Sequence, residues 1–134
     1  MRPLGYWIKE IDRRIEEDFG RLLADEGLTR RHWQVLHTIA QGPVTSAELD
    51  RALAPFLSAG SPTVRPQADD LADRGWALMT SDGTATLTPA GREAHDRVAA
   101  RVGAARARVI EGLSEADYVT LVGLLERVAG NLAA

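Results

Sequence analysis

The stretch from Asp73 to Arg92 constrains the fold most, because it combines helix-end and hairpin signals within a few residues. A helix is expected to end at Gly75, since glycine adopts the left-handed cap conformation at low cost. Two β-favouring runs follow, residues 76–80 and residues 84–87. The Asp82-Gly83 pair between them is a strong hairpin-turn signal. The sequence therefore predicts two short antiparallel strands joined by a tight turn.

A second helix is expected directly after this hairpin. Thr88 can cap its first turn, and Pro89 fits the first helical position because proline lacks the amide hydrogen that this position leaves unused. A helix, a tight hairpin and another helix in this order are the layout of the wing in a winged helix-turn-helix protein. Many such proteins bind DNA.

Composition favours one domain with a substantial core. The chain has 134 residues, of which 45% are hydrophobic, and it contains no cysteine. Disulfides, thiolate metal sites and cysteine redox switches are therefore excluded. No apolar run approaches the roughly 18 residues needed to span a bilayer, and no signal-peptide pattern opens the chain. We expect a soluble cytoplasmic protein.

The charge balance gives DNA binding little support. The formal net charge is −3, whereas DNA-binding proteins usually carry a basic surface. Residues 29–92 carry six Lys and Arg against six Asp and Glu, so even the central segment is neutral. Binding to DNA would have to depend on individually placed arginines, backbone amides and helix N-termini.

Helices are expected on both sides of residues 73–92. Apolar residues recur at helical spacing from Leu4 to Leu23, which predicts one long amphipathic helix that closes near Gly27. A second helix should begin after Thr29 and stop at Gly42-Pro43, and its expected apolar face consists of Trp33, Leu36, Ile39 and Ala40.

A third helix is predicted to open with the capping box formed by Thr45 and Glu48. Its inward residues are expected to be Leu49, Ala52, Leu53 and Phe56, and a turn should span residues 58–62. The fourth helix should begin near Arg65 or Pro66, because a proline deeper inside it would remove a backbone hydrogen bond. Its expected core-facing residues are Ala68, Leu71 and Ala72.

Two long helices are expected to complete the chain. The first has a narrow stripe of Ala90, Ala94, Val98, Val102, Ala105 and Val109 and should end at Gly112. The second is capped by Ser114 with Asp117, and its stripe runs from Tyr118 to Leu132. The apolar faces of the terminal helices exceed what a small centre can cover. A two-fold homodimer would bury them, and an intramolecular bundle of the same helices is the alternative.

The order of elements and four sequence pieces together resemble the MarR family of winged helix-turn-helix transcriptional regulators. The pieces are Leu28-Thr29-Arg30-Arg31-His32-Trp33-Gln34-Val35-Leu36, Thr45-Ser46-Ala47-Glu48-Leu49, Leu71-Ala72-Asp73-Arg74-Gly75-Trp76 and Leu87-Thr88-Pro89-Ala90-Gly91. The resemblance covers nearly the whole chain. It implies a homodimer joined through the terminal helices, a recognition helix in the major groove, a wing near the minor groove and a palindrome-like operator. It usually implies repression that a small, often aromatic ligand relieves.

The chain departs from the family pattern in two places. The family's wing is usually longer and carries an Asp-x-Arg stretch whose arginine enters the minor groove. Here the tip is only Ser81 to Thr84, and no arginine lies between Arg74 and Arg92. Pro66 is also unusual in the recognition region. Recognition should therefore depend mainly on the segment from Ser61 to Gln67.

Candidate DNA contacts follow from this arrangement. Arg65 is the leading base reader, because a guanidinium can bond guanine in two places; the alternative is a surface ion pair with Asp69. Ser61, Thr63 and Gln67, in the same segment, are the other candidate base readers. The remaining candidates, for which phosphate contact, ordinary capping and solvated charge compete as explanations, are Arg30, Arg31, Thr45, Ser46, Arg51 and Thr84.

Other kinds of site have weaker support. Trp7, Trp33 and Trp76 could line a ligand pocket, although tryptophans at helical spacing are more often core residues. The three histidines do not share metal-ligand spacing, so we expect no metal site. Phosphate-loop, nucleophile-elbow and zinc-protease motifs are missing from the sequence, which predicts neither catalytic residues nor a cofactor.

The sequence thus predicts a mainly α-helical single domain, residues 1–134, with a small β-hairpin wing. Residues 29–88 should form the DNA-binding lobe, and residues 1–27 and 89–134 should form a helical dimerisation region. The predicted function is that of a homodimeric, sequence-specific transcriptional repressor, whose expected partners are double-stranded DNA, a second copy and a small-molecule effector. The alternative is a winged-helix protein-interaction module with weak or lost DNA binding.

Overall fold

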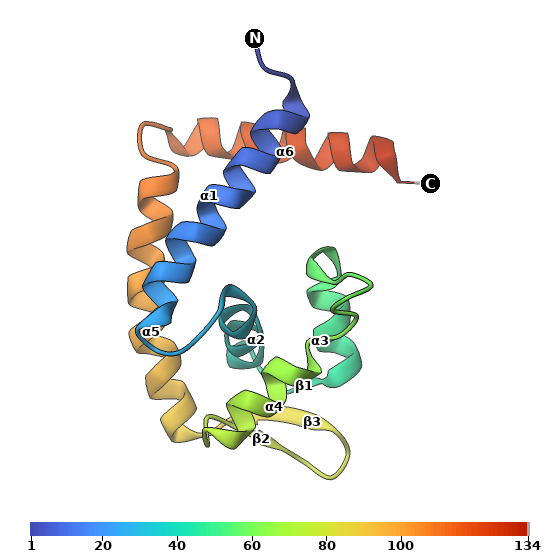
Figure 1. The fold of residues 1–134 in the computed structure, drawn as a ribbon, viewed down its shortest axis with the longest axis vertical. Coiled ribbons are helices and arrows are strands. Elements are labelled where there is room, and N and C mark those ends of the chain that lie inside the picture. Colours follow the sequence, from blue (N-terminus) through green and yellow to red (C-terminus); the bar gives the residue numbers. More distant parts are fainter. Residues whose placement is uncertain (134) are drawn as a thin grey trace. The chain divides into compact units, whose positions relative to one another are not determined.

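The computed structural model describes residues 1–133, which form two compact units, residues 1–102 and the residues from Gly103 onward. The elements of the first unit follow the expected order (Figure 1). They are α1 (Leu4–Ala24), α2 (Arg30–Ala40), β1 (Val44–Thr45), α3 (Ser46–Ala52), a 3-10 turn (Ala54–Phe56), α4 (Arg65–Asp73), β2 (Ala77–Met79), β3 (Thr84–Leu87) and most of α5 (Pro89–Val109).

Apart from the end of α3, the helices of this unit begin and end close to where their sequence signals predict. Thr29 caps α2 by accepting a hydrogen bond from the His32 amide, and the His32 ring accepts one from the Thr29 amide. Gly27, with φ 67°, ends the turn that follows α1. Pro66 is the second residue of α4, where its missing amide hydrogen costs no helical bond.

The wing is part of a three-stranded antiparallel sheet with the order β1-β3-β2. In the predicted hairpin, Ala77 pairs with Leu87 and Met79 with Ala85. Gly83 occupies the turn with φ 83°, which fits a glycine. The sequence did not predict β1, because a two-residue strand has no detectable period of its own. It pairs with β3 through Val44–Ala85 and Thr45–Thr84.

The core of the first unit is built from α1, α2, α3, α4 and α5. Its largest fully buried side chains are Leu23, Val35, Leu36, Ile39, Leu49, Val64, Leu71 and Val98. Two predicted core residues of α3 are exposed instead, namely Ala52 and Phe56. Ala52 is the last residue of α3, and the chain then forms a 3-10 turn containing Pro55, which turns Phe56 off the apolar face. Ala90 and Val109, the first and last members of the apolar stripe of α5, are exposed in the single chain.

Gly91 allows α5 to approach the base of the wing closely. A Cβ atom on this residue would lie 1.9 Å from the carbonyl oxygen of Trp76, which is far inside van der Waals contact. Thr88 fixes the same junction, because its hydroxyl donates to the Gly75 carbonyl at 2.5 Å and accepts from the Gly91 amide at 3.0 Å. The start of α5 and the start of β2 are therefore held together by backbone contacts.

The second unit contains the end of α5 and α6 (Glu115–Leu132). Gly112, with φ 87°, lies between the two helices, and Ser114 forms the predicted capping box with Asp117. None of the residues of α6 is buried within the single chain. No described helix is long and apolar enough to cross a membrane.

Candidate nucleic-acid interface

The start of α4 is fixed by an aspartate from α3. One carboxylate oxygen of Asp50 accepts a hydrogen bond from the Val64 amide at 2.9 Å, and both oxygens lie 3.0 Å from the Thr63 hydroxyl, which donates to them. The Thr63 hydroxyl in turn accepts from the Arg65 amide at 3.1 Å. Bonds to a carboxylate are among the stronger hydrogen bonds in proteins. Asp50 therefore sets the position of the first turn of α4 relative to α3.

Arg65 occupies the position that this arrangement presents to solvent. It is the first residue of α4, and its side chain is 73% exposed. Its Nε atom lies 4.0 Å from a carboxylate oxygen of Asp69, which is the outer limit of an ion pair between two largely exposed groups. The guanidinium is thus only loosely tied to the helix surface.

The other candidates around Arg65 differ in how free they are. Ser61 is exposed, and its backbone pairs with Ser58 across the turn before α4. Thr63 is half-buried, with its hydroxyl already donating to Asp50. Gln67 turns its amide oxygen inward, where it is buried without a hydrogen-bond partner. Of these three, Ser61 has the most accessible side chain.

The start of α3 has the capping box that its sequence predicts. The Thr45 hydroxyl accepts from the Glu48 amide at 3.2 Å, and the Glu48 carboxylate accepts from the Thr45 amide at 3.1 Å. This backbone bond from Thr45 is the main reason that the pKa of Glu48 lies below its ordinary value. Ser46 is the first residue of the helix, and Arg51 is exposed in its last turn.

The two arginines that open α2 differ in how far their side chains are already bound within the protein. Arg30 is bound by two carboxylates of α1, with Asp12 and Glu16 each 3.1 Å from its Nη1 atom, and only 15% of its side chain is exposed. Arg31 bonds the Gln34 side chain and lies over the Phe56 ring, with its guanidinium carbon 4.8 Å from the ring centre. Arg30 is therefore engaged with α1, whereas Arg31 keeps donors available.

The wing tip is closed by its own residues. Asp82 accepts hydrogen bonds from the Thr80 hydroxyl and from the Thr84 amide, and Thr80 and Thr84 are also joined through their backbones at 2.8 Å. These bonds, led by the one from Thr80, hold the pKa of Asp82 below its ordinary value. The tip of the wing therefore carries a carboxylate charge at neutral pH.

The three tryptophans occupy different surroundings. Trp7 is 47% exposed on α1, and Trp33 is buried in the core. Trp76 is half-buried at the base of the wing beneath the Arg74 guanidinium, which lies 5.1 Å from its ring centre. A shared ligand pocket lined by all three stays a prediction.

Two of the polar contacts that sequence reasoning missed lie in the first unit. One is the Asp50 arrangement, and the other is a hydrogen bond of 3.0 Å between the rings of His37 and His95, with Asp96 3.0 Å from the far nitrogen of His95. Both join residues far apart in the chain, and nothing in the local pattern marks them. Among the described residues, no three His, Asp or Glu side chains are grouped to hold a metal ion.

No family model and no curated protein matches the chain by sequence. Solved structures do match it. The Mycobacterium tuberculosis MarR family protein Rv2887, solved in complex with DNA, is 28% identical with a TM-score of 0.74 over 96% of this chain and 98% of its own. The reduced form of MarR from E. coli is 22% identical, with a TM-score of 0.74 over 96% of this chain and 94% of its own.

A MarR family transcriptional regulator from Silicibacter pomeroyi has a TM-score of 0.80 at 18% identity, covering 97% of this chain and 89% of its own. The agreement extends over the helices, the three-stranded sheet and their order. The resemblance that the sequence indicates is confirmed at the level of the fold: this chain has the winged helix fold of the MarR family regulators whose solved structures it matches.

Proposed function

We propose that this protein is a DNA-binding transcriptional regulator that reads base edges with the first turn of α4. The observation that carries the proposal is Arg65, an exposed arginine on the first residue of a helix whose start is fixed by Asp50. A guanidinium held at a helix start can bond two acceptors of guanine in the major groove. The likeness to Rv2887, which was solved in complex with DNA, supports the same role.

The remaining candidates divide into base-reading and backbone-contacting groups. Ser61 and Arg65 are proposed to face bases. Thr63 and Gln67 are proposed to join them, although the Thr63 hydroxyl is bonded to Asp50 and the Gln67 amide oxygen is buried. Phosphate contacts are assigned to the amides near Thr45 and Ser46, to Arg51 and to Arg31, because phosphates are bound by helix N-termini and cations. Arg30 would have to leave its two carboxylates to take part. Thr84 is the one wing candidate.

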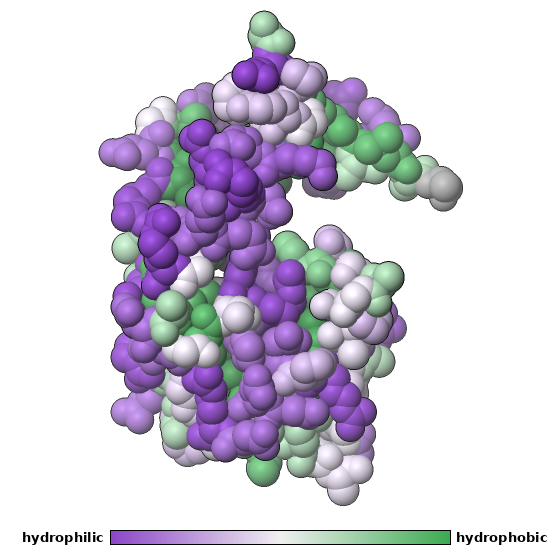
Figure 2. Space-filling view, in the orientation of Figure 1, coloured by the Kyte–Doolittle hydropathy of each residue, from purple (hydrophilic) through white to green (hydrophobic). Residues whose placement is uncertain are grey.

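The protein is proposed to work as a homodimer on a palindrome-like operator. Within each unit, apolar side chains lie exposed on terminal helices. On α1 these are Leu4, Trp7, Ile8 and Ile11, and on α6 they are Tyr118, Val119, Leu121, Val122, Leu124, Leu125 and Leu132. Figure 2 shows hydrophobic residues along the C-terminal part of α6. So many exposed large apolar side chains on the terminal helices favour a protein interface. Light scattering at micromolar concentration should give twice the chain mass, and a monomer would contradict the proposal.

Repression in the cytoplasm, relieved by a small molecule, is the regulatory part of the proposal. The small-molecule part is supported by Rv2887, which was solved with p-aminosalicylic acid and with salicylic acid. Reporter expression from the protein's own promoter should rise when the gene for this protein is deleted. A fall in expression would indicate activation instead.

Selection from random DNA at two salt concentrations tests the core of the proposal. A specific binder should enrich one two-fold related site, and its affinity should fall steeply as salt rises. Arg65→Ala should cost about 1–3 kcal/mol of binding free energy and relax the preference at one base pair. Arg21→Ala, at an exposed position of α1, is the matched control. An unenriched pool, or equal losses in both variants, would refute base reading by Arg65.

A protein-interaction module with weak or lost DNA binding is the second candidate. The neutral central segment, residues 29–92, and the short wing favour it, since the wing tip carries Asp82 and lacks the arginine of the family's Asp-x-Arg stretch. This function predicts a stable protein partner and no DNA complex even at low salt. Specific operator binding would rule it out.

A further inference from the structure

The exposed face of α4 carries a carboxylate one helical turn after Arg65. Residues four apart lie on the same side of a helix, so Arg65, Asp69 and Asp73 form one row. All three are exposed, whereas Ala68 and Leu71, on the other side of the helix, are buried in the core. Asp69 is therefore the first acidic side chain on the face that α4 would turn toward a DNA groove.

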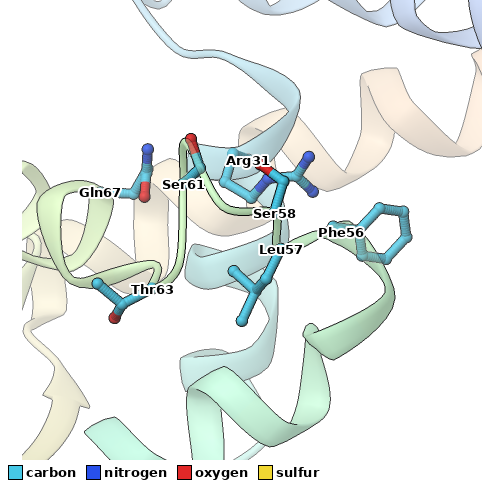
Figure 3. A pocket seen from close by; sticks show the side chains of 7 residues that line it. All are labelled: Arg31, Phe56, Leu57, Ser58, Ser61, Thr63 and Gln67. Atoms are coloured by element: carbon cyan, nitrogen blue, oxygen red, sulfur yellow. The ribbon is translucent and has the colours of Figure 1, made fainter.

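The polar side chains next to Arg65 are turned elsewhere. Those of Thr63 and Gln67 line a small pocket beside the start of α4 (Figure 3). The Thr63 hydroxyl donates to Asp50, and the amide oxygen of Gln67 is buried. The other residues between Arg65 and Asp69 are a proline and an alanine, which have no polar side-chain atom. Asp69 is thus the next exposed polar side chain after Arg65 along the helix.

The carboxylate of Asp69 is held only weakly within the protein. One of its oxygens lies 4.0 Å from the Nε atom of Arg65, and the two side chains are 60% and 73% exposed. An exposed ion pair at this distance contributes little to stability. The neighbouring Asp70 differs, because its carboxylate lies 2.9 Å from the Nε2 atom of His32 on α2. Asp69 therefore keeps acceptor oxygens for a donor outside the protein.

A carboxylate that enters the major groove finds only two kinds of base donor. They are the N4 amino group of cytosine and the N6 amino group of adenine. The adenine amino group lies between two acceptors, its own N7 atom and the O4 atom of the paired thymine, whereas the cytosine amino group has an acceptor on one side only. Both acceptors beside adenine would repel a carboxylate. Cytosine is therefore the base that best offsets the repulsion between Asp69 and the DNA phosphates.

We propose that Asp69 is a specificity-determining residue whose carboxylate accepts a hydrogen bond from the N4 amino group of a cytosine. Four residues of helix advance about 6 Å, and successive base pairs are about 3.4 Å apart. The cytosine should thus lie within about two base pairs of the guanine that Arg65 binds. The inference rests on the proposed function, because it concerns the same helix and the same partner.

Selection from random DNA with three further variants tests this assignment. Arg65→Ala identifies the position of the guanine, and the wild type should enrich a cytosine near it. Asp69→Asn should change the preferred base at the cytosine position to adenine, because an amide can accept from N6 and donate to N7. Asp73→Asn removes the same charge one turn later and should keep the wild-type site, since recognition helices contact bases with their N-terminal residues.

Binding to two operators that differ at the cytosine gives the size of the effect. Thymine carries an acceptor where cytosine carries the amino group, so this replacement should weaken binding of the wild type by about tenfold. In Asp69→Ala the same replacement should change affinity by less than about twofold, because the carboxylate is gone. The preference for guanine at the Arg65 position should persist in Asp69→Ala, and thermal unfolding checks that each variant is folded.

Three outcomes would overturn the assignment. The first is a cytosine preference retained in both Asp69 variants, and the second is an equal change of preference in Asp73→Asn, which would show a general effect of charge. The third is a loss of preference only at the guanine, since Asp69 would then be a positioning residue for Arg65. An unenriched pool would refute the proposed function and this inference with it, whereas an enriched operator without the cytosine would refute the inference alone.

Discussion

Two aspartates in this protein accept similar hydrogen bonds, but one is bonded to residues distant in the sequence and the other only to its neighbours. Asp50 accepts from the Thr63 hydroxyl and the Val64 amide, and Asp82 accepts from the Thr80 hydroxyl and the Thr84 amide. The partners of Asp50 lie thirteen and fourteen residues away on the start of another helix, whereas those of Asp82 lie two residues away on either side.

The difference concerns what each aspartate positions. Asp50 fixes α4 relative to α3, so it places Arg65 with respect to the whole lobe. Asp82 shapes only the turn that contains it. The same kind of hydrogen bonding therefore anchors the start of α4 to α3 at Asp50, and closes only the wing tip at Asp82. This contrast suggests that specificity, if the protein reads DNA, belongs to α4 and not to the wing.

The largest expected loss of stability comes from a substitution at the base of the wing, where α5 approaches β2 closely. In Gly91→Ala, the new methyl group would lie 1.9 Å from the Trp76 carbonyl oxygen, so β2 or α5 must move. We expect a loss of at least about 1–3 kcal/mol in the free energy of unfolding, as for other overpacked sites. Denaturant unfolding at fixed protein concentration measures it.

Gly20→Ala is the control for this substitution. It has open space around the added carbon and lies inside α1, where alanine is favoured over glycine. This variant should be at least as stable as the wild type. If both glycine variants unfold alike, the close approach at Gly91 does not limit stability.

The Asp50 arrangement should show the next largest effect. Asp50→Ala removes charge-assisted bonds to two groups and should destabilise the protein by about 1.5–3 kcal/mol. Asp50→Asn keeps an acceptor oxygen for the Val64 amide and should lose less. Operator affinity should fall in the same order, because Arg65 loses its fixed position. Unfolding and binding curves for both variants check this.

Asp82→Ala provides the comparison, because the hydrogen bonds of the Asp82 carboxylate all stay within its own turn. It should change stability less than either Asp50 variant. A larger loss at Asp82 than at Asp50 would contradict the view that the wing tip is self-contained.

The sequence predicted the parts of this fold that depend on neighbouring residues. The caps at Thr29, Thr45 and Ser114, the Asp82-Gly83 turn and the start of α4 near Arg65 all have local causes, and the structure confirms them. A cap or a turn is decided by side chains within three or four residues, which a sequence shows directly.

The rest depended on contacts across the fold. The Asp50 bonds and the His37–His95 pair join distant residues, and no periodicity reveals them. The burial expected for Phe56 was wrong because the helix changed to a 3-10 turn just before it. The engagement of Arg30 with α1 also required the folded arrangement, since its carboxylates lie fourteen and eighteen residues away.

Reversing the charge at the wing tip should give the wing a contact with DNA phosphate. In Asp82→Arg, a carboxylate at the tip gives way to a cation able to reach phosphate. Operator affinity should increase a few-fold, and the salt slope should steepen by about 0.9 for one new phosphate contact. Salt-dependent binding measures both. Glu111→Arg makes the same change in net charge outside the wing, and an equal gain there would show a general charge effect.

The smallest expected effect is the acid sensitivity of the wing turn. The hydrogen bonds from Thr80 and Thr84 lower the pKa of Asp82, so the folded turn favours the ionised form. Its contribution is then fully present above the ordinary aspartate pKa of about 3.9 and is lost as the pH falls through the lower folded value. Carboxyl NMR shifts should place the midpoint for Asp82 below that of an unstructured aspartate, and Thr80→Val should move it back. A midpoint that Thr80→Val leaves unchanged would show that the hydroxyl does not hold this carboxylate.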